Sequence, residues 1–221
     1  MKNMKNNNTT FRLDLLTSTD EQRPAMMGVM IEDKYAIATN GHYMAVIDWK
    51  ETGLNLDPAV GRLIPAPIWK IFATSFHAVL FTDERRGVSV RYTAKKGGME
   101  QTAYGEILDT FPNWRSVVNA DYTVESEGFD TVGINFGLFG VVSDALGIGS
   151  GFMSSIKLSG KYGGPIVFDI SVWGHNERKN VGFGLIMPIV WKPNSSTNGV
   201  EYKDRVLEVS PNKPSKLAEV A

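Results

Sequence analysis

Apolar and polar residues alternate along much of the first half of the chain, which is the period of strands that bury one face. Three such runs follow closely on one another, at Met26 to Ile31, Tyr35 to Thr39 and Tyr43 to Ile47. Between the second and third runs stands the pair Asn40-Gly41, whose tolerance of positive φ allows a tight reversal. The pattern predicts a hairpin, with His42 and Tyr43 emerging beside its turn where a partner reaches them.

The middle of the chain repeats one order of elements: a strand, a helix and three strands. The first copy comprises Leu63 to Pro65, a helix at Pro67 to Ser75, and strands at Ala78 to Phe81, Gly87 to Thr93 and Gln101 to Leu108. The second copy comprises Gly133 to Phe136, a helix at Gly137 to Gly147, and strands at Ser155 to Leu158, Pro165 to Ile170 and Val181 to Ile189. We expect helices only in these two places, and therefore an α+β protein dominated by antiparallel strands.

A shorter unit precedes the two copies. In it, Phe11, Leu13 and Leu15 alternate with Arg12 and Asp14, which is the strand period and predicts a strand before the hairpin. The run is too short to supply both a strand and a helix. The chain therefore reads as about three units, of which the first is incomplete.

Three segments resemble motifs of the bacterial DNA polymerase III beta subunit, the sliding clamp. The stretch from Ala36 to Val46 resembles the family's ATDGHRLA, Leu108 to Val118 resembles FPDYRRVLP, and Leu185 to Val190 resembles VMPMRL. The segments stand in the family's order, and Arg23-Pro24 with Gly28 to Glu32 is similar to the strand before the first motif. The resemblance covers roughly residues 15 to 190.

The resemblance implies the DNA-clamp, or processivity, fold, in which each half-domain unit places a short helix on one face and antiparallel strands on the other. It divides the chain into a polar N-terminal tail (1–10), a domain like the family's middle domain (11–122), a half-domain like its last domain (123–191) and a C-terminal tail (192–221). A bacterial clamp subunit has three complete domains, so the chain resembles a shortened, phage-encoded or mobile-element-encoded form. Ring formation stays open at this point.

In the family, partner proteins insert a short apolar peptide between the middle and last domains. Carried over by motif position, the groove residues here are Thr39, Gly41, His42, Tyr43, Met44, Pro112, Ser116, Val117, Leu185, Met187, Pro188 and Ile189. A pocket with small residues at its floor and Met and Pro at its edges suits a Leu or Phe side chain of the bound peptide. Tyr43 and Ser116 stand where the family usually has Arg, so this groove is less basic. The alternative is that Met44, Met187 and Ile189 are ordinary core residues.

Charge sets limits on contact with DNA. The formal net charge is −1, which argues against a protein that holds nucleic acid by bulk positive charge. By the resemblance, a clamp encircles double-stranded DNA without sequence preference, and Lys70 lies on the helix that would face it. The helix at Gly137 to Leu146 carries no Lys or Arg. A solvated surface lysine is the alternative explanation for Lys70.

Composition favours a non-enzymatic protein of a reducing, cytoplasmic compartment. There are no cysteines, and no apolar run reaches the about 20 residues that span a bilayer. His42, His77 and His175 form no metal-binding spacing, and no nucleophile motif is present, so we expect no cofactor and no metal.

Two function classes follow. The first is a clamp-like replication processivity factor that forms a homo-oligomer around DNA and tethers a polymerase, or another protein with a clamp-binding motif. The alternative is a clamp-derived adaptor or inhibitor that binds partner peptides without forming a ring. The tail from residue 192 onward leaves beside the groove's last wall, where it would compete with a peptide, add an edge strand or have no role.

Overall fold

The computed structural model describes residues 11–83, 87–94, 96–118, 136–146, 156–158, 166–173 and 178–187. Contacts between Cα atoms divide the chain into two units, Met1–Val190 and Trp191–Ala221, and every described residue belongs to the first unit. The predicted domain boundaries stay a prediction, and so does the tail from residue 192 onward.

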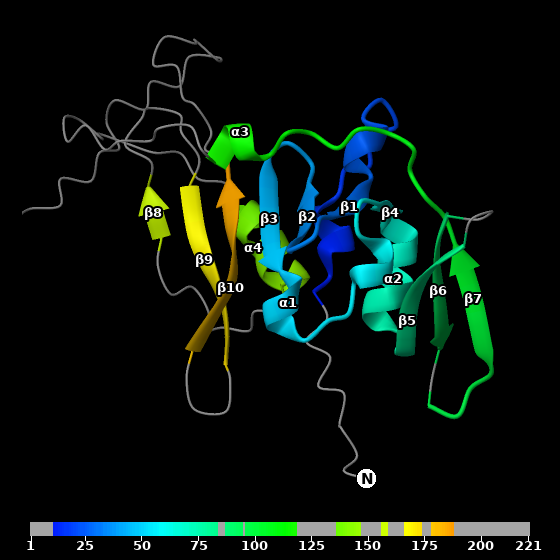
Figure 1. The fold of residues 1–221 in the computed structure, drawn as a ribbon. Helices are drawn as coiled ribbons and strands as arrows, with labels where there is room; N and C mark the ends of the chain where they lie inside the picture. Colours follow the sequence, from blue (N-terminus) through cyan, green and yellow to red (C-terminus); the bar gives the residue numbers. More distant parts are fainter. Residues whose placement is uncertain are drawn as a thin grey trace, which may run out of the picture. The chain divides into compact units, whose positions relative to one another are not determined.

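A seven-stranded antiparallel sheet is the largest element of the fold (Figure 1). Its strands stand in the order β4-β1-β2-β3-β10-β9-β8. Their bounds are β1 Gly28–Ile31, β2 Tyr35–Thr39, β3 Tyr43–Asp48, β4 Leu63–Pro65, β8 Ile156–Leu158, β9 Ile166–Trp173 and β10 Arg178–Ile186. Strands β3 and β10 are far apart in sequence and pair directly, so one sheet joins the two parts of the chain predicted as separate domains.

A second sheet has three antiparallel strands, β5 Phe76–Asp83, β6 Gly87–Thr93 and β7 Glu100–Tyr104, in that order. The register of β5 against β6 shifts between Phe76 and Val79, and His77 within this bulge adopts φ 52°. Every strand pairing among the described residues is antiparallel. The α+β prediction is therefore confirmed at the level of fold class.

Four α-helices occur in the described residues: α1 Trp49–Thr52, α2 Ala66–Thr74, α3 Arg115–Val118 and α4 Phe136–Ala145. Helices α2 and α4 confirm the two predicted positions. The expectation of helices only there is wrong, because α1, α3 and the 3-10 helices η1 Leu13–Leu16, η2 Pro24–Met26 and η3 Asp57–Ala59 also form. These extra helices are single turns, too short to produce a helical period in the sequence.

The predicted strand at Phe11 to Leu16 is the 3-10 helix η1 instead. Leu13 and Leu16 are both fully buried, whereas Leu15 is 38% exposed. Residues three apart share a face of a 3-10 helix, so burial follows the spacing of Leu13 and Leu16 and not the alternation that suggested a strand. Arg12 and Asp14 are joined by two side-chain hydrogen bonds of 2.8 Å.

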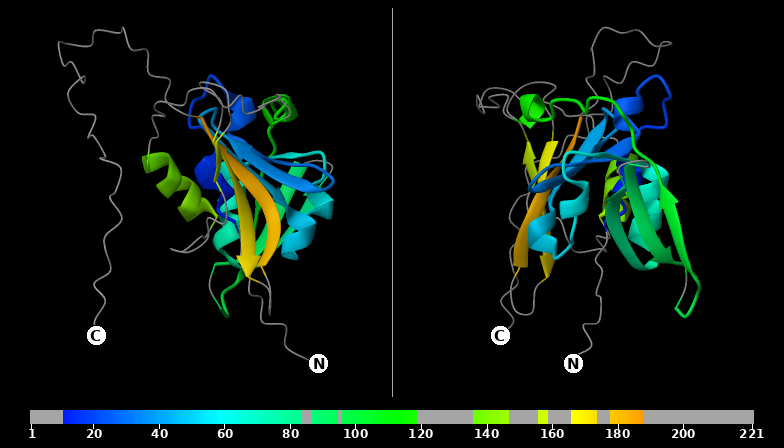
Figure 2. Two further views of the ribbon diagram at one scale, coloured as in Figure 1. Left: turned by 90° about the vertical axis from the view of Figure 1, so that its left-hand side faces the viewer. Right: turned by 45° about the vertical axis from the view of Figure 1, so that its right-hand side comes forward.

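One hydrophobic core fills the space between helices α2 and α4, η1 and both sheets. Trp69 of α2 is fully buried, packs edge-on against Phe72, and donates its indole N–H to the carbonyl of Phe11 at 2.8 Å. The left view of Figure 2 shows α4 and α3 on opposite sides of the seven-stranded sheet. The side that faces α4 carries the core, and the other side carries the candidate site.

The element order predicted for residues 63–108 is observed as β4, α2, β5, β6 and β7, although β7 ends at Tyr104. In the later copy the predicted first strand lies outside the described residues, apart from Phe136, which begins α4. The three-unit architecture therefore stays a prediction. None of the helices in the described part of the chain has the length and hydropathy to cross a membrane.

Candidate functional site

The β2–β3 turn is held by side chains at the predicted Asn-Gly position. The Asn40 carboxamide oxygen accepts the backbone N–H groups of His42 and Tyr43, at 2.9 and 3.2 Å. The Thr39 hydroxyl donates to the Tyr43 carbonyl at 2.8 Å and accepts the Gly41 N–H at 3.1 Å. Gly41 adopts φ 89°, a conformation that strains other residues. The sequence thus specifies this turn locally, and His42 is exposed beside it.

Tyr43 differs from the expectation that it lies open beside the turn. Its side chain points into the main core and is buried, and its hydroxyl donates to the Leu15 carbonyl at 3.3 Å. Burial raises the pKa of this phenol. Tyr43 therefore fixes the turn to η1 instead of presenting a side chain to a partner.

Strands β3 and β10 bring the first and third motifs together. Leu185 stands opposite Met44, and the Met187 N–H donates to the His42 carbonyl at 2.8 Å just past the end of β10. At Gly182 of β10, an added Cβ atom would overlap the Val46 carbonyl oxygen of β3. Only glycine fits this position without displacing β3.

The second motif lies across the outer side of the same strands. Trp114 packs edge-on against Tyr35, with ring centroids 5.8 Å apart, and at 6.1 Å from Phe183. Together with α3 it covers an outer apolar cluster whose buried members are Ile37, Met44, Val46, Trp114 and Leu185. All three motif segments therefore contribute to one cluster.

Glu32 anchors the second motif to the sheet. One carboxylate oxygen accepts the Trp114 indole N–H and an Arg115 N–H, each at 3.0 Å, and the other oxygen accepts a second Arg115 N–H. The Arg115 guanidinium also lies over the Trp114 ring, 4.3 Å from its centroid. The hydrogen bonds from Arg115 lower the pKa of Glu32, against the effect of burial, and Trp114 adds to the lowering.

The predicted groove residues fall into three groups by exposure. Thr39, Tyr43, Met44 and Leu185 are buried; Pro112, Val117 and Met187 are half-buried; Gly41, His42 and Ser116 are exposed. Pro188 and Ile189 lie outside the described residues. Met44, Val117, Leu185 and Met187 all belong to the outer cluster, so the structure brings these four predicted residues together. Ser116 points its hydroxyl at the Asn113 carbonyl, 2.7 Å away.

Trp114, Glu32 and Arg115 hold the site together, yet the sequence analysis did not select them. The large side chain of Trp114 inside the second motif was one available signal. Glu32 is the last residue of the segment that is similar to the strand before the family's first motif. Their pairing joins residues 82 and 83 positions apart. No local spacing predicts that contact.

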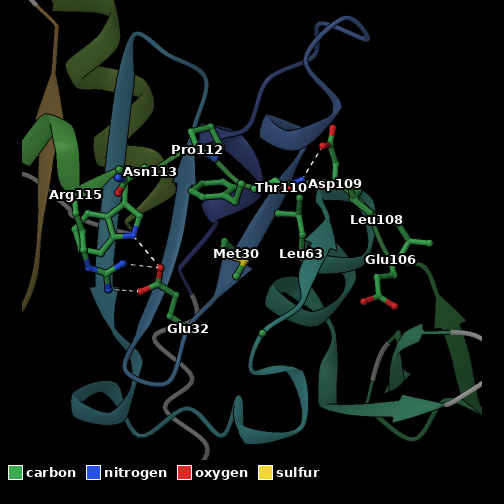
Figure 3. Close-up of a pocket in the computed structure, with 14 residues that line it drawn as sticks. Met30, Glu32, Leu63, Glu106, Leu108, Asp109, Thr110, Pro112, Asn113 and Arg115 are labelled. Carbon is green, nitrogen blue, oxygen red and sulfur yellow. Dashed lines mark hydrogen bonds and ion pairs between the residues drawn. The ribbon is translucent and has the colours of Figure 1, made fainter.

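A cavity of about 660 Å³ lies beside the cluster, under the segment from Glu106 to Arg115 (Figure 3). Met30 of β1 and Leu63 of β4 form part of its floor, and Phe111 and Pro112 form part of its wall. Pro112 is the only predicted groove residue that lines it. The cavity thus shares Trp114, Phe111 and Met30 with the outer cluster, whereas Val117 and Met187 do not line it.

Lys70 is exposed on α2, where its carbonyl accepts the Thr74 hydroxyl. Asp144 is exposed on α4. The two helices thus present one basic and one acidic side chain, and no strongly basic face is formed by their described residues. Within the part of the chain that the structure describes, no three His, Asp or Glu side chains gather as metal ligands.

Comparisons with known proteins give no sequence match and a structural similarity of low score. No protein-family model matches the chain, and no curated protein matches it. Among solved structures, the chain is similar to DNA polymerase III subunit beta from Borrelia burgdorferi, determined in complex with a natural product, at 12% sequence identity and a TM-score of 0.37. The similarity covers 81% of this chain and 45% of that one, so the chain spans less than half of that protein's length.

Proposed function

We propose that this chain is a clamp-like, non-enzymatic processivity factor, which assembles with copies of itself around double-stranded DNA and tethers a polymerase or another partner. The observation that carries the proposal is the convergence of three segments that are distant in sequence. Met44, Val117 and Met187 each belong to a different clamp-like motif, and all three contribute to the outer cluster. Chance matches to three short motifs give no reason for such a convergence.

The exposure of these residues fits a peptide groove. Buried Met44 and Leu185 form a base, while half-buried Val117 and Met187 and exposed His42 stand above it. A Leu or Phe side chain placed against Met187 and Val117 would be removed from water on an already packed surface. Flexible thioethers adapt to anchors of different shape, which suits a surface that serves several partners.

Self-assembly is supported by the sheet edges. Among the described residues, β7 and β8 each pair with one strand only and end their sheets. Unpaired backbone groups on a sheet edge favour association with another strand. Copies can join head to tail, the edge of one copy pairing with a different edge of the next. They form a closed ring if the rotation from one copy to the next adds up to a full turn.

The groove is tested with a short peptide that carries Leu and Phe anchors. Burial of one large apolar side chain contributes roughly 1.5–3 kcal/mol, so Met187→Glu weakens peptide binding by about tenfold or more. Fluorescence anisotropy of the labelled peptide measures the affinity, and circular dichroism checks that the variant is folded. Lys70→Glu, on the exposed side of α2, is the control that introduces a Glu away from the groove, and it leaves peptide affinity unchanged. Unaltered affinity in Met187→Glu would show that the groove is assigned wrongly.

The alternative, an adaptor or inhibitor that binds peptides without a ring, is favoured by the sparse charge of α2 and α4. Light scattering at tens of micromolar, with and without duplex DNA, separates the two functions. A processivity factor gives an oligomer that retains DNA, whereas a strict monomer that still binds the peptide supports the adaptor. Deleting residues 192–221 tests the tail: a rise in peptide affinity identifies it as a competitor for the groove.

A further inference from the structure

The cavity beneath the segment Glu106 to Arg115 is open and has an apolar base. Met30 and Leu63 point outward from adjacent strands β1 and β4 into it, as Figure 3 shows. Its volume of about 660 Å³ is within the range of roughly 300–1,000 Å³ in which proteins hold ligands. Leu108, at its rim, is 90% exposed. This leaves a large apolar side chain open to solvent beside the cavity.

The wall of the cavity offers backbone hydrogen bonds. The N–H and C=O groups of Leu108, Asp109 and Phe111 form no backbone hydrogen bond with other described residues. Before this wall, Ile107 still donates to the Leu63 carbonyl at 3.1 Å, and after it α3 begins. The wall is thus an unpaired stretch of backbone next to an edge strand, which is how proteins receive an extended peptide.

The charges around the cavity favour a cation at one end. Glu32 is paired with Arg115, and Glu106 with Arg62 at 2.7 Å. Asp109 is exposed and has no ion pair among the described residues; one of its oxygens accepts the Thr110 N–H at 2.7 Å. Among the described residues, the Asp109 carboxylate thus stands beside Leu108 without a cationic partner.

We propose that this cavity is a second docking site, separate from the groove, for an extended segment of a partner protein in which an aliphatic side chain stands next to Lys or Arg. The aliphatic side chain lies on Met30 and Leu63. The backbone of the segment pairs with Leu108 to Phe111, and its basic residue reaches Asp109.

Methyl NMR of protein labelled at the methionine methyl groups tests this directly, because Met30 lines the cavity and Met187 lines the groove. The probe is the peptide Ac-Ser-Lys-Leu-Lys-Val-Ser-NH2, and Met30→Leu and Met187→Leu assign the two signals. We expect titration to shift the Met30 signal and leave the Met187 signal in place. A shift confined to Met187 places the peptide in the groove and overturns the second site while leaving the proposed groove intact.

Two altered peptides and two protein variants test the recognition. Replacing both lysines of the probe by Glu, or N-methylating its Leu and Val amides, abolishes the Met30 shift. Asp109→Lys weakens binding by about threefold, the effect expected of one exposed ion pair. Asp144→Lys, with the same charge change on α4, leaves binding unchanged. Equal affinity for the N-methylated peptide, or equal losses in both variants, contradicts the proposal.

The chain's own N-terminus is another occupant to exclude, since Met1 to Thr10 contains lysines and methionines. Deleting residues 2–10 without adding peptide leaves the Met30 signal in place if the site serves a partner. A shift on deletion would show that the tail fills the cavity, and would overturn the assignment to a partner protein.

Discussion

The two faces of the seven-stranded sheet are both apolar, but they are covered in different ways. On the inner face, Ala36, Ala45 and Ile47 pack under α2, α4 and η1 as part of the main core. On the outer face, Ile37, Met44 and Val46 are covered mainly by Trp114 and its neighbours in one short segment. Every residue of β3 is buried as a result. The inner cover consists of helices. The outer cover is the segment from Glu106 to Val118, called the strap, which Glu32 holds to the sheet through Trp114 and Arg115.

Because of this difference, we expect the inner face to be needed for folding and the outer face to be available for binding. Trp69 inside and Trp114 outside have matching roles, since each donates its indole N–H to an acceptor far away in sequence. Trp69 bonds to a backbone carbonyl within the core, whereas Trp114 bonds to the carboxylate of Glu32 near the surface. The outer cover is therefore the part that opens at lower free energy.

The largest effect is expected for Trp69→Ala. Trp69 is fully buried, so truncation leaves a cavity and removes the partner of the Phe11 carbonyl. We expect a loss of roughly 3–5 kcal/mol in the free energy of unfolding. Urea unfolding followed by circular dichroism measures it. A loss below that of Trp114→Ala would reverse the ranking of the two faces.

A smaller and more local effect is expected for Trp114→Ala. The side chain is 7% exposed, and several of its neighbours are only partly buried, so we expect about 3 kcal/mol or less. Hydrogen exchange locates the change: amide protection falls in α3 and stays in α2. Equal loss of protection in both helices would mean that the two covers unfold together.

The smallest effect is expected for Glu32→Gln, and it depends on pH. The pKa of Glu32 is lowered on folding from its usual value of 4.5, so its ionised form stabilises the folded chain above that pH. This contribution disappears as the pH falls through the lowered pKa. Loss of a hydrogen bond to a charged partner suggests a cost of about 1–2 kcal/mol at pH 7 that vanishes in acid.

Thermal unfolding between pH 7 and pH 3 measures the difference between Glu32→Gln and the unaltered chain. Glu21→Gln is the control, because Glu21 is exposed and has no ion pair among the described residues. Its curve follows the unaltered chain at every pH. A pH-independent difference for Glu32→Gln would show that the contact acts by shape and not by charge.

The sequence predicts elements with a local pattern better than contacts between distant segments. The bounds of β2 and β6 match the expected runs, and α2 begins one residue before the predicted start, because each pattern is local and complete. The run from Phe11 to Leu16 fits two periods: Phe11, Leu13 and Leu15 alternate as in a strand, whereas Leu13 and Leu16 are spaced as in a 3-10 helix. Contact with the core decides between the two. Pro188 and Ile189, which belong to the predicted last strand and groove wall, lie outside the described residues.

The apolar members of the candidate site were predictable from motif resemblance, whereas its anchoring was not. Met44 and Leu185 lie opposite each other because β3 and β10 pair in one particular register. The contact of Glu32 with Trp114 and Arg115 depends on the path of the strap over the sheet. The cavity beneath the strap depends on the same path and leaves no period in the sequence.

The pairing of β3 with β10 also has a consequence for synthesis of the chain. Strand β10 begins about 130 residues after β3 ends, so on a ribosome that adds roughly 5–20 residues per second it follows roughly 7–26 s later. During that interval the growing chain has an apolar β3 whose second edge lacks its native partner. Neighbouring nascent chains on one messenger expose the same edge, so slow translation of the later segment favours pairing between copies over the native sheet.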